Sequence, residues 1–144
     1  MPIKTFKSFM DTGEQQTLRL STNKGLIGYR ILKFQAIDQD PGTNTLEGIF
    51  KVYTTERETI DGSVKFDDPT LIAICYFENN TSGTYSSWDT IIVDNKTVNQ
   101  DLYITYADNS GGEIGCNYYI ELEQVKLSVD EAAVATLKDM RGSN

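Results

Sequence analysis

Hydrophobic and polar residues alternate in short runs along most of the chain, and turn-forming residues separate these runs. Alternation with a period of two is typical of strands that place one face on a core and the other in water. The runs lie at residues 16–20, 26–37, 48–60, 90–95, 101–107 and 117–127. The sequence therefore predicts an all-β protein, an antiparallel β-sandwich of the jelly-roll kind.

The long run 26–37 does not keep one phase from end to end. Tyr29 and Ile31 share one parity, whereas Phe34 and Ala36 share the other. A bulge, which adds one residue to one strand of a pair, produces such a change of phase. We therefore expect a bulge near Ile31.

Two further signals place strands in the middle of the chain. Residues 70–78 are apolar on both parities, which predicts a central strand covered on both faces. Asp61 and Gly62 suit a tight hairpin turn, so the run 48–60 is expected to return as a short strand over residues 63–66.

The hydrophobic period changes at the end of the last predicted strand. Ser128 and Glu131 have the spacing of a helix capping box, and Gly142 suits the C-terminal cap, which predicts a helix over residues 128–142. The apolar stripe of this helix is narrow. It consists of Val129, Ala133, Leu137 and Met140.

A short helix with a narrow apolar face is marginal in isolation and needs a surface to lie on. Either it covers an open end of its own sandwich, or it docks on a neighbouring subunit or partner. The N-terminal arm, residues 1–15, leaves the same two alternatives open, because Ile3, Phe6 and Phe9 are exposed unless paired. We expect both ends to be partner-binding and the protein to form a homo-oligomer.

The length of 144 residues suits one domain, residues 1–144. The apolar runs are shorter than the roughly 18 residues of a membrane span, so no membrane partner is expected. The first residues lack the apolar block of a secretory signal, which predicts synthesis in the cytoplasm. The net charge of −8 disfavours direct nucleic-acid binding.

The sequence offers little catalytic chemistry. There is no histidine, so neither a Ser-His-Asp nor a Cys-His site can be built from this chain. Paired carboxylates have ordinary explanations in turns or on a solvated strand face; they are Asp67 with Asp68, Asp38 with Asp40, and Glu121 with Glu123. We expect no enzyme, no metal and no cofactor.

Cys75 and Cys116 lack the spacing of a zinc site and are expected to be packing residues. Tyr85 and Trp88 fall in a polar segment, residues 79–89, that predicts an exposed loop. Their rings either form a platform for a sugar or another ligand, or lie on the edge of their own sheet.

The chain resembles small virion structural proteins of tailed bacteriophages, especially those of marine bacteria. The resemblance covers most of the chain. The stretches that carry it are TLRLSTNKGLIGYRILKFQAIDQDPGT, NQDLYIT, NYYIELEQVKL and VATLKDMR.

This resemblance implies a β-sandwich that is incorporated into a virion in many copies as a capsid cement, decoration or minor coat subunit. Its partners would be the major capsid protein or other virion proteins, and it would be found in the virion. The alternative is a phage tail or surface module that recognises a host glycan. The negative charge favours the outside of the shell over a lining that faces packaged DNA.

Overall fold

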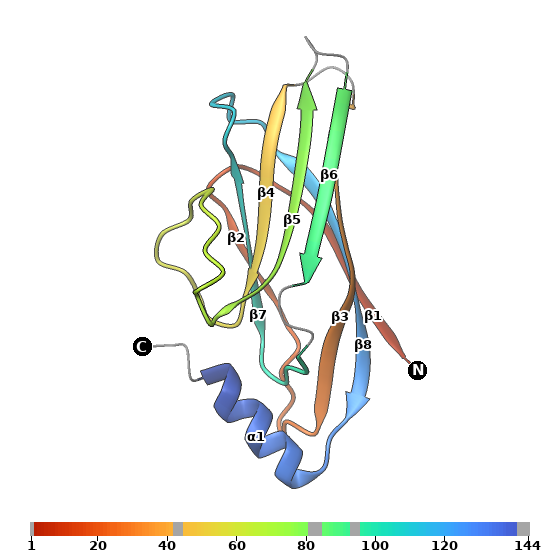
Figure 1. The fold of residues 1–144 in the computed structure, drawn as a ribbon. Helices are drawn as coiled ribbons and strands as arrows, with labels where there is room; N and C mark the ends of the chain where they lie inside the picture. Colours follow the sequence, from red (N-terminus) through yellow and green to blue (C-terminus); the bar gives the residue numbers. More distant parts are fainter. Residues whose placement is uncertain (1, 42–44, 81–84, 93–95, 141–144) are drawn as a thin grey trace.

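The computed structural model is a sandwich of two antiparallel sheets with one helix at its C-terminal end (Figure 1). It describes residues 2–41, 45–80, 85–92 and 96–140, without the side chains of Asn80, residues 85–88, Asp139 and Met140. The smaller sheet has the order β1 (Ile3–Met10), β8 (Cys116–Lys126), β3 (Ile27–Asp38). The larger has the order β2 (Gln15–Leu18), β7 (Leu102–Asp108), β4 (Leu46–Tyr53), β5 (Leu71–Asn80), β6 (Tyr85–Ile92). The predicted all-β sandwich is confirmed.

The strand order is that of a jelly roll, in which a long antiparallel hairpin winds around itself. Strands from the two ends of the chain pair with one another: β8 lies between β1 and β3, and β7 lies between β2 and β4. Only β6 departs from the pattern, because it pairs with β5 and not with β3. The Thr90 hydroxyl on β6 still donates a 2.7 Å hydrogen bond to the Phe34 carbonyl on β3, which links the two sheets at this margin.

The core fills the space between the sheets with inward-facing residues of both. Phe50 on β4 contacts Tyr106 on β7 and Tyr118 on β8, with ring centroids 4.5 and 5.6 Å apart. The Tyr106 hydroxyl donates to the Ile114 carbonyl at 2.7 Å, so the buried phenol keeps a partner. This packing holds the two sheets in a fixed relation.

Two predictions about the strands are confirmed. The register of β3 against β8 shifts between Ile31 and Lys33, where the hydrophobic phase changes. Strand β5 lies between β4 and β6, and its residues are buried toward the core and also on the opposite face of the sheet. The periodicity thus located both an irregularity and an interior strand.

The predicted hairpin at Asp61 and Gly62 is wrong. Strand β4 ends at Tyr53, and residues 54–70 form a long loop without strands. Lys51, which is 2% exposed, explains the loop's course: its ammonium group donates to Asp61 Oδ1 at 3.0 Å and to the Ser63 carbonyl at 2.6 Å. The loop folds over the sheet because it supplies the partners of this buried charge.

The N-terminal segment, which was expected to be an arm, is strand β1 over most of its length. Its residues pair with β8 from Ile3 opposite Glu123 to Met10 opposite Cys116. Phe6 packs against the core, whereas Ile3 and Phe9 remain exposed on this edge strand. The segment is therefore part of the body.

Helix α1 (Val129–Met140) starts where the sequence predicted and with the predicted cap. The backbone N–H of Glu131 donates to Ser128 Oγ, and the N–H of Ser128 donates to Glu131 Oε1, both at 3.1 Å. The helix lies at the end of the sandwich next to the ends of β3, β7 and β8 (Figure 1). Gly142, the predicted C-cap, lies outside the described residues.

Candidate interaction surfaces

Helix α1 contacts the body through small residues and turns larger apolar ones outward. Ala132 and Ala135 are buried, while the exposed fractions of Val129 and Leu137 are 74% and 64%. Ala133 is exposed as well. The helix thus covers the end of its own sandwich, but the stripe predicted from the sequence is not the face that does so.

The side chain of Asn99 fixes the helix in this orientation. Asn99 is fully buried, and its Nδ2 donates to the carbonyls of Gly25 and Ala132 at 3.0 and 3.1 Å and to Thr136 Oγ1 at 2.8 Å. The outward orientation of Val129 and Leu137 follows from this contact.

Hollows flank the helix on both sides. One, of about 570 Å³, is lined by Leu26 of the body and by the exposed apolar residues of the helix. The other, of about 490 Å³, lies against Val125, Leu127 and Val134. We call Val129, Ala133 and Leu137, with these two hollows, the helix surface. The predicted fourth member of the stripe, Met140, ends the helix, and its side chain lies outside the described ones.

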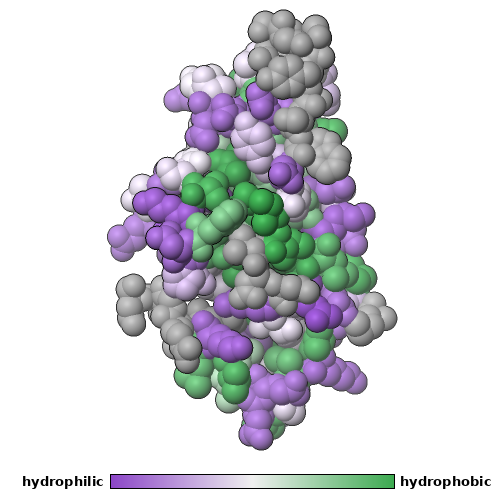
Figure 2. All heavy atoms as spheres, in the orientation of Figure 1, coloured by the Kyte–Doolittle hydropathy of each residue, from purple (hydrophilic) through white to green (hydrophobic). Residues whose placement is uncertain are grey.

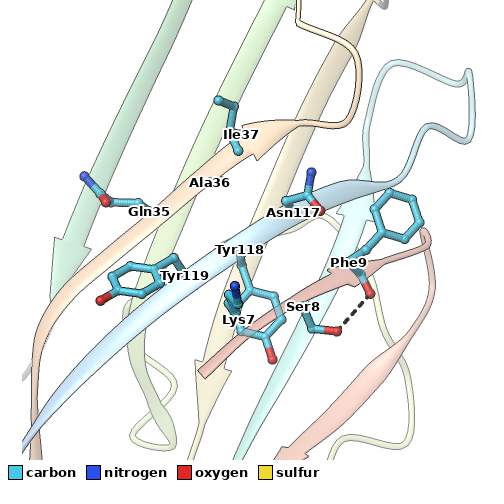
Figure 3. Close-up of a pocket in the computed structure, with 9 residues that line it drawn as sticks. All are labelled: Lys7, Ser8, Phe9, Gln35, Ala36, Ile37, Asn117, Tyr118 and Tyr119. Carbon is cyan, nitrogen blue, oxygen red and sulfur yellow. Dashed lines mark hydrogen bonds between the residues drawn. The ribbon is translucent and has the colours of Figure 1, made fainter. Parts of the chain in front are cut away.

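A third hollow, of about 590 Å³, lies on the smaller sheet (Figure 3). Asn117 and Tyr119 of the central strand β8 are half-buried on the sheet's outer face. Lys7 and Phe9 of β1 flank them on one side, and Gln35 and Ile37 of β3 flank them on the other. We call this hollow the sheet groove.

The aromatic rings of the sheet groove are held in place by their neighbours. The Tyr119 hydroxyl donates to Glu121 Oε2 at 2.9 Å, and this hydrogen bond raises the pKa of Tyr119. A Cβ on Gly115 would overlap the Phe9 ring, so the glycine leaves the space that the ring occupies. Both rings are therefore positioned before any ligand arrives.

The outer face of the larger sheet is also apolar, and the loop 54–70 lies over part of it. Ile49, Tyr53, Leu71, Ile74 and Ala107 form a second buried cluster there. Figure 2 shows apolar residues gathered over the middle of this face. Ile91 of β6, opposite Ile74 of this cluster, is 39% exposed. Arg57 of the loop lies over the Tyr53 ring, 4.3 Å from its centroid, so the loop shields this end of the cluster from water.

Several of the acidic residues that the sequence pairs have structural partners. Asp68 accepts from Thr70 and pairs with Arg57 at 3.2 Å; Glu123 pairs with Arg30 at 2.9 Å. Glu121 pairs with Lys33 at 3.7 Å while it accepts from Tyr119.

Asp38 is buried and accepts from the Asn79 amide, and the N–H of Asp40 donates to it. Across the described ranges, no three His, Cys, Asp or Glu side chains gather as metal ligands would.

Tyr85 and Trp88 belong to β6 and not to a loop as predicted. Trp88 lies opposite Phe77 of β5, and Tyr85 lies opposite Asn80. Their side chains lie outside the described ones, so the proposed sugar platform at these residues stays a prediction. The structure instead places Phe9 opposite Asn117, with Tyr119 lining the same hollow, a juxtaposition that the sequence does not predict. Only the pairing of β1 with β8 reveals that juxtaposition.

No protein-family model matches this chain, and no curated protein shows significant similarity to it. Within the described part of the chain, no helix has the length and apolar character needed to span a membrane.

Proposed function

We propose that this protein is a structural subunit of a virus particle, a capsid cement, decoration or minor coat protein. It acts by protein–protein contacts and not by catalysis. Its partners are the major capsid protein or other virion proteins, and copies of the chain associate with one another on the particle.

The exposed stripe of helix α1 carries this proposal. Val129 and Leu137 remain in water although the helix is capped and tied to the body by Asn99. Burial of apolar surface contributes roughly 25 cal/mol per Å², so a partner that covers these side chains stabilises the complex. Because the helix is already ordered, binding does not have to fold it first. Contacts of this kind, repeated over many copies, add up to firm attachment.

Two further observations support the same role. Jelly rolls occur in viral capsid domains, but also in lectins. The fold therefore supports the proposed function only in combination with the helix surface. The net charge of −8 suits a position on the outside of a shell, away from packaged DNA. The helix surface would then face the shell.

The test uses particles purified from cells that supply either the normal chain or a variant. Mass spectrometry gives the number of copies of this chain relative to the major shell protein. We expect many copies of the normal chain. Deletion of residues 128–144 and the variants Val129→Glu and Leu137→Glu should abolish incorporation while the circular dichroism of the sheets is retained.

The matched controls are Val64→Glu and Leu32→Glu, which place the same charge on exposed apolar residues outside the helix surface. They should be incorporated normally. Unchanged occupancy of the Val129 and Leu137 variants would contradict the role of the helix. Absence of the normal chain from particles would overturn the proposed function itself.

A further inference from the structure

We propose that the sheet groove binds a short neutral oligosaccharide. This inference goes beyond the structural role and does not depend on it. The groove lies on the smaller sheet, away from helix α1, and its residues belong to β1, β3 and β8.

The groove is made of two cross-strand rows on the outer face of the sheet. One row is Phe9, Asn117 and Ile37; the other is Lys7, Tyr119 and Gln35. Two residues along a strand and three strands across span about 7 by 10 Å. The volume of about 590 Å³ falls within the range of small-molecule sites.

The side chains in these rows suit both the apolar C–H face and the polar hydroxyl groups of a sugar. The C–H face of a pyranose ring packs on aromatic rings, which Tyr119 and Phe9 offer on opposite sides of the groove (Figure 3). Sugar hydroxyls both donate and accept, as do the side-chain amides of Asn117 and Gln35. Each row therefore presents one ring beside one amide.

The groove is preorganised, which limits the entropy lost on binding. Strand β8 is hydrogen-bonded on both sides, so the backbone under Asn117 and Tyr119 is fixed. Glu121 orients the Tyr119 ring, and the Phe9 ring occupies the space over Gly115. An ordered polar and aromatic floor of this kind needs little rearrangement to bind a rigid sugar ring.

Other occupants fit less well. An added peptide strand requires the open edge of a sheet, whereas the groove lies on a sheet face. A second copy of the chain would need a face poor in charge, but Lys7, Lys33 and Glu121 occupy consecutive rows. An anionic ligand would find a single cation, Lys7, in the lining of the groove, within a molecule of net charge −8. A neutral sugar avoids all three conflicts.

The experiment titrates the full-length chain with cellotriose, maltotriose and triacetylchitotriose, and follows the side-chain amide signals by NMR. We expect at least one of these sugars to bind saturably and to shift the side-chain amides of Asn117 and Gln35. Tyr119→Ala should weaken that binding about tenfold or more. Tyr119→Phe keeps the ring and should weaken it much less.

The matched control is Tyr76→Ala. Tyr76 lies on the outer face of the other sheet and donates to Glu78, two residues on, as Tyr119 does to Glu121. Its loss should leave sugar binding unchanged. The amide shifts of the unmutated chain keep the test decisive if Tyr119→Ala does not fold.

Three results would overturn the inference. The first is no saturable binding of any of the sugars at millimolar concentration. The second is binding that shifts signals outside the groove. The third is self-association that Tyr119→Ala abolishes while the sugars have no effect, which would assign the groove to a second copy. None of these results bears on particle incorporation, so the two proposals fail separately.

Discussion

The Nδ2 atom of Asn99 lies 3.1 Å from the carbonyl oxygen of Ala132 and donates a hydrogen bond to it across the junction between the sandwich and helix α1. This contact decides which side of the helix meets the body. It joins residues 33 positions apart and buries the amide completely.

Replacing Asn99 with leucine should loosen the helix and expose its backbone to exchange. Loss of the hydrogen bonds to Gly25, Ala132 and Thr136 removes the polar tie at this end, at a cost of about 1–3 kcal/mol in the free energy of unfolding. Hydrogen exchange of the α1 amides and urea unfolding measure the two effects. Asn23→Leu, at an exposed position in a nearby turn, is the control. Equal effects of the two variants would contradict the conclusion that Asn99 holds helix α1 on the body.

The buried ammonium group of Lys51 predicts an asymmetry between two substitutions. Asp61→Ala leaves that charge buried with the Ser63 carbonyl as the partner that remains, whereas Lys51→Met removes the charge and keeps the volume. We expect Asp61→Ala to lower the free energy of unfolding by about 1–3 kcal/mol and Lys51→Met to lower it less. Urea midpoints measure both, with Asp67→Ala, exposed on the same loop, as the control. The reverse order would show that Lys51 does not hold the loop.

Acid should destabilise the protein through carboxyl groups that bind loop backbone. Burial alone would raise the pKa of Asp108, but the N–H groups of Ile114 and Ser110 outweigh it and hold the pKa below 3.8. Asp101 behaves in the same way through Ser21 and Leu20.

Because the folded pKa lies below the unfolded value, the stability from these carboxyls is complete above about pH 5, where the unfolded carboxyls are also ionised, and is lost as pH falls through the folded pKa. Unfolding measured between about pH 5 and 2 should show this fall, and Asp108→Asn should make it shallower. The fall should remain unchanged in Asp67→Asn, since Asp67 is exposed. A pH-independent free energy of unfolding over this range would refute the prediction.

The two thiols should resist modification while the protein is folded. Burial raises the pKa of Cys75 to about 11 and that of Cys116 to about 12, so almost no thiolate forms at pH 8 and neither sulfur is accessible. A thiol-specific reagent should therefore label the chain only in denaturant, where both cysteines react. Rapid labelling of the folded chain would mean that the two sheets separate far more often than the packing indicates.

Local sequence signals predicted the parts of the fold that local chemistry decides. The capping pair Ser128 and Glu131, the bulge near Ile31 and the interior strand β5 follow from spacing and periodicity alone. The hairpin at Asp61 failed because Lys51, a buried lysine within the run 48–60, determines where the loop runs.

The interaction surfaces were less accessible to sequence reasoning, because contacts between distant parts of the chain determine them. The stripe of Val129 and Leu137 was recognised from the sequence. The face of α1 that meets the body depends on Asn99, however, which lies outside the helix and so outside its periodic pattern. The sheet groove depends on the register that sets Phe9 opposite Asn117. Neither relationship leaves a trace in hydrophobic periodicity, because each joins distant parts of the chain.

The pairing of β1 with β8 affects how the protein can fold during synthesis. Ile3 lies opposite Glu123, so β1 cannot form this pairing during synthesis until β8, far later in the sequence, has been made. Pairings so remote in sequence also slow folding. Charged side chains on a strand oppose its association with other strands, and β1 carries two of them, Lys4 and Lys7.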